Sequence, residues 1–187
     1  MATATASELE VLDPPTSTEP EGFYEVVDGQ VREKAQMGSF ETELAANLLA
    51  LLHPFAQSNK LGRANMEMLY LLNRETKLQL RPDVAFVSAE RWPLSRKAPR
   101  TAAWDVVPDL AVEIASPSNL INEDARKIEQ YFQAGVKQVW LILPSVEKIH
   151  IYHSPKEIQV LGRGDTLEGG SVVPGFQVHL NDLFGEA

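Results

Sequence analysis

Hydrophobic and polar positions divide the chain into segments with different periods. The segment "YEVVDGQVRE" has two alternating runs around Asp28 and Gly29, a pair that favours a tight hairpin turn. From Ser39, a suitable N-cap, the apolar spacing lengthens to three or four residues, which predicts a helix. The expected buried stripe of this helix consists of Phe40, Leu44, Leu48, Leu51 and Phe55.

The following segments return to strand-like patterns. "NMEMLYLLN" (65–73) and "KLQLRPDVAFVS" (77–88) each predict a strand, with a turn near Asn73 between them. A basic loop follows. Next comes "LAVEIA" (110–115), whose continuous apolar character is typical of a strand buried on both faces.

The second half of the chain predicts a helix between two buried strands. "SPSNLINEDARKIEQYFQAGV" begins with capping residues and ends at Gly135, a good C-terminal cap. "KQVWLILP" (137–144) is a second buried strand, and short antiparallel additions follow it. The order is helix, three strands, helix, strand. Because a buried strand, a helix and another buried strand form a parallel crossover, we expect an α/β fold with a mixed central sheet and added hairpins. The stripe expected on this second helix is Ile121, Ala125, Ile128 and Phe132.

Composition narrows the class of protein. The 187 residues suffice for one domain, expected over 23–187, whereas 1–22, rich in Thr, Ser, Pro and Glu, is typical of a flexible arm. The absence of cysteine excludes disulfides and thiolate ligands. No apolar run approaches the roughly 20 residues of a membrane span, and the N-terminus lacks a secretory pattern. We therefore expect a cytoplasmic protein without a membrane partner.

The charge distribution bears on nucleic-acid binding. A net charge of −9 argues against non-specific coating of nucleic acid, which needs basic surface. One basic segment, "RWPLSRKAPR", carries Arg91, Arg96, Lys97 and Arg100 with no acidic residue between them. It is either a solvated loop or a contact for the phosphate backbone of DNA.

Two acidic residues interrupt predicted strands. Glu113 lies in the middle of its apolar strand and shares a face with Ala111 and Ala115, which leave space beside the carboxylate. Asp83 follows Pro82 at the start of another apolar run. If the two strands are neighbours, both carboxylates converge on one face. Such a pair of hard oxygen ligands suits Mg²⁺ or Mn²⁺.

Lys127 is the third candidate, on the flank of the helix that follows the Glu113 strand. Its ammonium group could reach the carboxylates and orient or help deprotonate a water, or stabilise charge on a phosphate. Structural alternatives stay open for all three residues. Glu113 could form a buried ion pair with Arg81 or Lys127, Asp83 could be a turn residue, and Lys127 could pair with Glu123 on the surface.

The set "RPDVAFVSAER", "DLAVEIASPSN" and "DARKIEQYFQAGVKQVWLILP" resembles the Uma-two family. Its members are named as candidate restriction endonucleases within the PD-(D/E)XK nuclease superfamily. The resemblance implies the core order given above, and a metal ion held by Asp83, Glu113 and the backbone carbonyl of Ile114. The superfamily lysine expected two positions after the glutamate is Ala115 here. The resemblance implies Lys127 as its replacement.

The start of the first helix is a further point of the resemblance. The family often has histidine there, and this chain has Glu41. Glu41 is expected on the flank of the helix stripe, so it is either a fourth active-site residue or a surface residue. Superfamily nucleases commonly act as dimers, and a homodimer is expected for that reason.

The leading hypothesis is therefore an endonuclease that uses Mg²⁺, with Mn²⁺ as a substitute, to hydrolyse phosphodiester bonds in DNA. The presence of Asp83, Glu113 and Lys127 favours it. The acidic net charge and the missing motif lysine favour an alternative, a catalytically silent nuclease-like module that binds nucleic acid or protein. A metal-dependent enzyme acting on a non-nucleic phosphate is a second alternative.

Overall fold

The structure is a computed structural model that describes residues 22–116 and 121–185, so the predicted arm, apart from Gly22, lies outside the described residues. Its centre is a six-stranded sheet in the order β10-β9-β8-β7-β6-β3. β7 and β8 are parallel, and the other neighbouring pairs are antiparallel, so the central sheet is mixed, as predicted. Its strands are β3 (Gly62–Met66), β6 (Val84–Ser88), β7 (Leu110–Ile114), β8 (Gln138–Leu143), β9 (Lys148–Ser154) and β10 (Glu157–Leu161).

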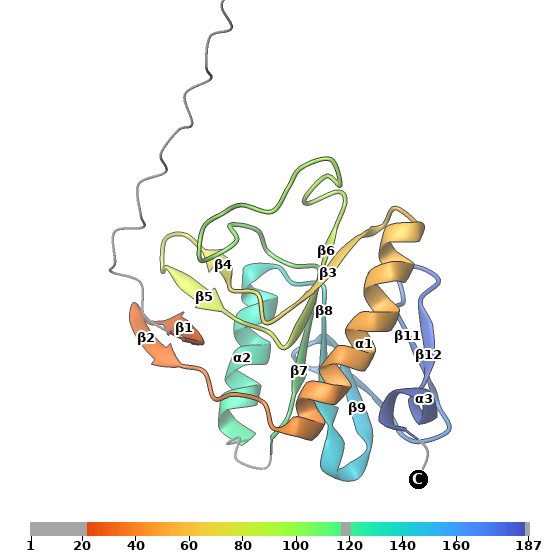
Figure 1. Cartoon of the computed structure of the whole chain (residues 1–187). Helices are drawn as coiled ribbons and strands as arrows, with labels where there is room; N and C mark the ends of the chain where they lie inside the picture. Colours follow the sequence, from red (N-terminus) through yellow and green to blue (C-terminus); the bar gives the residue numbers. More distant parts are fainter. Residues whose placement is uncertain (1–21, 117–120, 186–187) are drawn as a thin grey trace, which may run out of the picture.

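Helices cover both faces of this sheet (Figure 1). α1 (Ser39–Ser58) packs on one face, and α2 (Ile121–Ala134) connects β7 to β8 across the other. The predicted helical crossover between two parallel strands is therefore confirmed. The remaining elements are the 3₁₀ turn η1 (Pro144–Val146), the hairpin strands β11 (Thr166–Glu168) and β12 (Gln177–His179), and α3 (Leu180–Phe184). Among the described residues, none of the helices is long and apolar enough to cross a membrane.

A second sheet, in the order β2-β1-β5-β4, shares a hydrophobic cluster with α2. The turn of its β1–β2 hairpin contains Asp28 and Gly29, with φ of 55° and 72°. The type I′ turn, one of the two common two-residue hairpin turns, has positive φ at both central positions. The predicted hairpin is therefore confirmed. The strands of this sheet are β1 (Tyr24–Val27), β2 (Gln30–Glu33), β4 (Tyr70–Asn73) and β5 (Leu78–Leu80).

The segments 65–73 and 77–88 do not form one strand each, so that part of the prediction was wrong. Each segment passes from one sheet to the other, since β3 and β6 belong to the central sheet and β4 and β5 to the smaller one. The breaks occur at Glu67, whose φ of 49° is left-handed, and at Pro82, which has no N–H for a ladder. The turn predicted near Asn73 is present.

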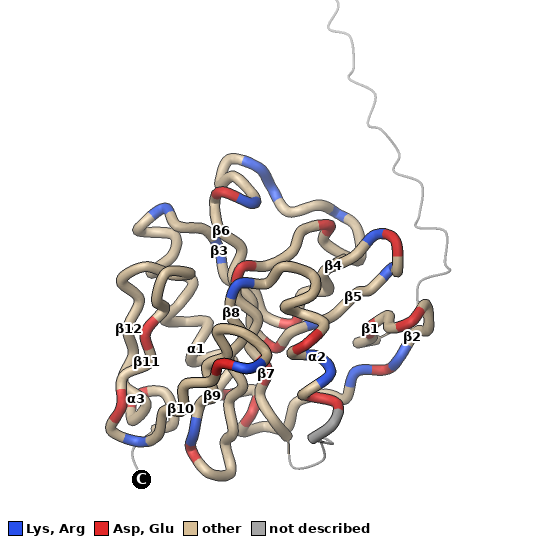
Figure 2. The backbone as a smooth tube through the Cα atoms, turned by 180° about the vertical axis from the view of Figure 1, so that it is seen from behind, with Lys and Arg blue, Asp and Glu red and all other residues tan. Residues whose placement is uncertain are grey.

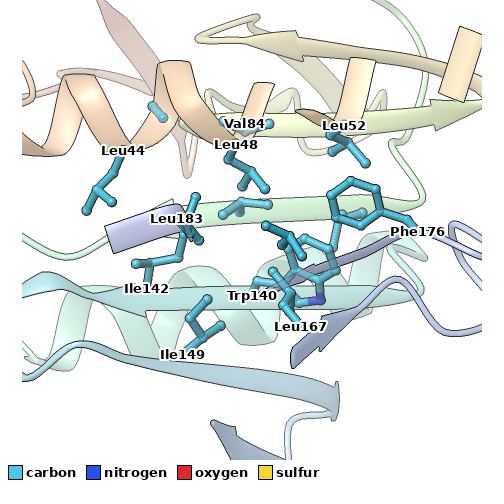
Figure 3. Close-up of a cluster of buried hydrophobic side chains, with 14 of the residues drawn as sticks. Leu44, Leu48, Leu52, Val84, Trp140, Ile142, Ile149, Leu167, Phe176 and Leu183 are labelled. Atoms are coloured by element: carbon cyan, nitrogen blue, oxygen red, sulfur yellow. The ribbon is translucent and has the colours of Figure 1, made fainter. Parts of the chain in front are cut away.

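Side chains alternate along β6 and β7 and separate two cores. Val84 and Val112 belong to the core under α1, and Ala85 and Ala111 to the core under α2. Figure 3 shows the first core, in which Trp140 of β8 and residues of α1 lie on the same face of the sheet. The strand faces predicted from the sequence are confirmed, and Asp83 and Glu113 fall on the α2 face by the same alternation.

The buried stripe of α1 differs from the predicted one. Leu44 and Leu48 are buried, but Phe40 and Leu51 are 45% and 43% exposed. Ser39 is the first helical residue, and Gly38 occupies the N-cap position. The stripe that is buried consists of Leu44, Ala45, Leu48, Leu52 and Ala56. Alanine lets the helix approach the sheet closely, so the buried face of α1 includes small residues. A pattern of large apolar side chains does not predict this face.

The stripe of α2 is also only partly as predicted. Ile128 is buried and Phe132 is partly buried, whereas Ala125 is exposed. Tyr131 is fully buried instead. The side chain of Ile121 lies outside the described residues. A tyrosine at this depth needs a partner for its hydroxyl group, and that partner is part of the candidate site.

Two leucines of α1 test this packing. We expect Leu48→Ala to lower the free energy of unfolding by about 2–5 kcal/mol, because it leaves a cavity in the core. Leu51→Ala changes the same residue type on the exposed side and should change stability by less than about 1 kcal/mol. Urea unfolding of both variants measures the difference. Equal losses of stability would contradict the observed orientation of α1.

Candidate active site

Asp83 and Glu113 lie side by side at one end of β6 and β7. Val84 pairs with Val112 in the antiparallel ladder, and the same register places Asp83 opposite Glu113. Both residues are almost fully buried, at 3% and 6% exposure. The sequence hypothesis of two carboxylates on one face of neighbouring strands therefore matches the geometry.

Both carboxylate oxygens of Asp83 have partners. Oδ2 accepts a hydrogen bond of 2.6 Å from the backbone N–H of Ile114, and Oδ1 accepts one of 2.5 Å from Lys34 Nζ. The first of these bonds links β6 to β7 just beyond their ladder, next to Pro82. The second brings in a cation from the segment between β2 and α1.

Glu113 is held by two residues of α2. The Tyr131 hydroxyl group donates a hydrogen bond of 2.5 Å to Oε1, and Lys127 Nζ lies 3.6 Å from Oε2. Lys127 and Tyr131 are four residues apart and therefore face the same way. Lys127 Nζ also lies 2.9 Å from Oε1 of Glu25, in β1. The single positive charge of Lys127 is thus shared between two buried carboxylates.

Glu25 connects the β1–β2 hairpin to this cluster. Its side chain is buried, and its Oε1 accepts a hydrogen bond of 3.0 Å from the backbone N–H of Arg81. The hairpin therefore supplies one acid, Glu25, and the segment after it supplies one base, Lys34. With all side chains ionised, the three carboxylates and two ammonium groups of the cluster leave one excess negative charge.

Burial and neighbouring charges shift the ionisation of the site. Burial is the main cause that raises the pKa of Glu113. Lys127 and Lys34 lower this pKa, Asp83 and Glu25 raise it, and the net result is a pKa of about 7. Burial lowers the pKa of Lys127, but Glu113 and Glu25 outweigh it and hold that pKa above its ordinary value. Burial and Glu113 also raise the pKa of Tyr131. Lys127 is thus a permanent cation, and Tyr131 stays a hydrogen-bond donor.

The cluster lines a pocket of about 180 Å³. Four residues predicted for the active site, Asp83, Glu113, Ile114 and Lys127, contribute to its wall. The structure therefore brings these predicted residues together. Lys127 is paired with acids inside the pocket, not with Glu123 on the surface.

Glu41 lies beside this pocket. It lines a neighbouring one with Phe40 and Ala115, and Ser116 contributes to both. Its carboxylate lies close to Gly38, the N-cap of α1. A role for Glu41 in the active site therefore stays a prediction.

Sequence reasoning missed Glu25 and Lys34 as members of the site. Glu25 has the same signal as Glu113, because it is a charged residue between apolar neighbours in a strand. Lys34 has no such signal because it lies in a polar stretch, "VREKAQ". Tyr131 was recognisable only as a residue aligned with Lys127 on the helix.

The donor set is compatible with a hard divalent cation. In the described ranges 22–116 and 121–185, no three Asp, Glu, His or Cys side chains are grouped so that they could hold a metal ion by themselves. Mg²⁺, however, usually binds one or two carboxylates and completes its shell with waters and substrate phosphates. Asp83 and Glu113 provide such a pair.

The basic loop lies at the other end of the central strands. It follows β6, whose first residue is next to Asp83, so the five-residue strand separates the loop from the acid pair. Arg91 has structural partners: its guanidinium contacts the Asp109 carboxylate at 3.1 Å and donates to the carbonyl of Gly135 at 2.7 Å. Arg96 lies over the ring of Trp92, at 3.7 Å. Figure 2 shows basic positions, in blue, on the loop above the label of β6.

The fold defines a class of protein. Around the central sheet, α1 is followed by β3, β6 and β7 and then by α2 and β8, which is the core order expected for a restriction-endonuclease-like fold. The profile of the Uma2 family, described as "Putative restriction endonuclease", matches residues 6–181. The chain therefore belongs to the Uma2 family, as the sequence resemblance predicted.

A solved structure confirms the fold. A crystal structure from Anabaena variabilis, described as "a putative nuclease belonging to DUF820", shares 18% sequence identity with the chain. The alignment covers 86% of this chain and 89% of that one, with a TM-score of 0.71. No curated protein matches the chain.

The raised pKa of Glu113 predicts how stability depends on pH. The folded state favours the protonated carboxyl group of Glu113. The contribution of this protonated group to the free energy of unfolding is therefore complete below about pH 4.5 and is lost as the pH rises through about 7. Glu113→Gln cannot ionise. Its unfolding free energy should therefore rise relative to the wild type by about 3 kcal/mol across this interval. Urea unfolding at several pH values measures the difference.

Asp109 provides the control for this prediction. It is a buried acid of the same chain segment, but Arg91 and Lys137 pair with it, at 3.1 and 2.8 Å. Asp109→Asn should therefore destabilise the protein by about 3–5 kcal/mol. If Glu113→Gln were as destabilising as Asp109→Asn, Glu113 would be part of a structural ion pair.

Proposed function

We propose that the protein is a metal-dependent endonuclease that hydrolyses phosphodiester bonds in DNA. The observation that carries the proposal is the opposed pair Asp83 and Glu113, with Lys127 Nζ 3.6 Å from Glu113 in the same pocket. The Uma2 family and the restriction-endonuclease-like fold support the nuclease class. The metal ion and the DNA substrate are the further steps of the proposal.

Three residues would hold the ion: Asp83, Glu113 and, through its backbone carbonyl, Ile114. When bound, Mg²⁺, or Mn²⁺ in its place, activates a water and neutralises charge on the phosphate. The Tyr131 hydroxyl group orients the Glu113 carboxylate through its hydrogen bond to Oε1. The Ile114 N–H does the same for Asp83 Oδ2.

Lys127 would act as a fixed positive charge and not as a base. Glu113 and Glu25 raise its pKa, so its ammonium group stays protonated at neutral pH. An ammonium group in this position orients the attacking water or stabilises charge that develops on the scissile phosphate. The role expected for the superfamily lysine, which Ala115 cannot perform, is thereby carried by α2.

Two further cations line the pocket: Arg32 of β2 and Arg126 of α2. Their location suits phosphates next to the scissile bond. The exposed residues Arg96, Lys97 and Arg100 lie at the other end of the sheet. They would contact the DNA backbone only at a distance from the cut. We propose that these three residues contact the DNA backbone away from the cut. Arg91 would keep its structural contacts within the protein.

One observation favours the second candidate, a catalytically silent module. Lys34 occupies Asp83 Oδ1, where a metal ligand needs a free oxygen. A chain that used Lys34 as a permanent counter-ion would keep the fold and bind nucleic acid or protein without cutting. Cleavage assays distinguish this candidate from the nuclease.

Incubation of the protein with plasmid, single-stranded DNA and RNA tests the proposal. We expect plasmid cleavage with Mg²⁺ or Mn²⁺ and none with chelator. Asp83→Asn and Glu113→Gln should reduce cleavage to background, and Lys127→Met should lower kcat by about 100-fold or more. If the chain acts as the predicted homodimer, linear product should appear without a build-up of nicked circles.

Glu129→Gln is the matched control, because Glu129 is an exposed acid on α2. It should cleave as the wild type does. Cleavage that persists in Asp83→Asn, or in chelator, would come from a contaminant or another site and would contradict the proposal. No cleavage of any substrate, with DNA binding retained, would support the silent module.

The salt dependence of DNA binding tests the basic loop. Replacing Arg96, Lys97 and Arg100 with glutamine should weaken binding and reduce the slope of log K against log salt by about 0.9 for each phosphate that the variant no longer neutralises. The cleavage rate at saturating DNA should stay unchanged, because the loop lies at the end of β6 opposite to the acid pair. An unchanged slope would mean that these three residues do not contact the DNA backbone.

A further inference from the structure

Lys34 enters the candidate site from the segment between β2 and α1. Its Nζ lies 2.5 Å from Asp83 Oδ1, and the two side chains are only 9% and 4% exposed. A charge-assisted hydrogen bond that is shielded from water in this way is stronger than a surface ion pair. Lys34 is therefore the main counter-ion of Asp83 in this structure.

The two bonds of Asp83 differ in how readily they can be broken. The bond from the Ile114 N–H is part of the central sheet, so breaking it would disturb β7. The bond from Lys34 ends on a flexible four-carbon stem. The backbone of Lys34 is itself fixed, because its N–H donates to the carbonyl of Phe23 at 2.9 Å. The Lys34 side chain can thus leave Asp83 while the hairpin stays in place.

An ammonium group and a divalent ion cannot share Asp83 Oδ1 at low cost. At a separation of a few ångströms, like charges repel strongly in a buried site, where the dielectric constant is low. A metal ion that uses Asp83 must therefore displace Lys34. Lys127 is placed differently, since Glu25 provides it with a closer partner than Glu113, at 2.9 against 3.6 Å.

We propose that Lys34 is an internal competitor of the metal ion for the Asp83 carboxylate. This inference rests on the proposed function and adds a property to it. Lys34 keeps Asp83 neutralised without metal and so sets the concentration of divalent ion at which the site fills. It is a positioning residue, and its effect should appear in metal binding even without DNA.

Calorimetric titration of the full chain with Mn²⁺, and separately with Mg²⁺, tests this proposal without reference to cleavage. We expect Lys34→Met to bind Mn²⁺ about tenfold or more tightly than the wild type, a factor that corresponds to one charge-assisted hydrogen bond. Lys34→Arg keeps the charge and should bind Mn²⁺ no more tightly than the wild type.

Arg126→Met is the matched control, because Arg126 lines the same pocket from the exposed face of α2. It removes one positive charge without freeing Asp83, so it should change Mn²⁺ affinity much less than Lys34→Met. Equal gains in affinity for the two variants would reduce the effect to general electrostatics and overturn the proposal. If Lys34→Met folds poorly, Lys34→Gln removes the same charge and is read in the same way.

Asp83→Asn separates this proposal from the proposed function. If it abolishes Mn²⁺ binding while Lys34→Met binds as the wild type does, the metal site stands and Lys34 is not a competitor. If Asp83→Asn binds Mn²⁺ as tightly as the wild type, the ion does not use Asp83. The proposed metal site then fails, and the role of Lys34 fails with it.

Discussion

Two like-charged carboxylates, Asp83 and Glu113, face each other in the interior of the protein, and several elements are arranged to make this tolerable. An isolated buried carboxylate costs several kcal/mol, and a second one nearby adds repulsion. The fold compensates with one backbone N–H, one tyrosine hydroxyl group and two lysines. Each acid has two of these partners, so removing one group would leave its acid with a single partner.

This constraint explains why distant parts of the chain meet at one pocket. β6 and β7 provide the acids, α2 provides Lys127 and Tyr131, and the hairpin region provides Glu25 and Lys34. Ala115 stands at the position, two residues after Glu113, where the superfamily resemblance implies a lysine. The cations of the site therefore come from outside the central sheet. The Lys34 side chain can move relative to Asp83, and the proposed exchange of this counter-ion for a metal ion would require that freedom.

The sequence predicted the β1–β2 hairpin and the strand faces, but only parts of the buried stripes of α1 and α2. Alternation along β6 and β7 assigned the faces of Asp83 and Glu113 correctly, and Gly135 marked the end of α2. It could not predict that the segments 65–73 and 77–88 change sheets, because that choice is made by long-range pairing. It also missed Lys34, whose importance comes from a hydrogen bond to a residue 49 positions away along the chain.

Diffraction from crystals grown with Mn²⁺, recorded with the anomalous signal of manganese, tests the central claim most directly. The account predicts a peak within about 2.0–2.4 Å of oxygens from both Asp83 and Glu113, with Lys34 Nζ withdrawn from Asp83. A structure at saturating Mn²⁺ that shows no peak at this pair, and Lys34 still bound to Asp83, would contradict it.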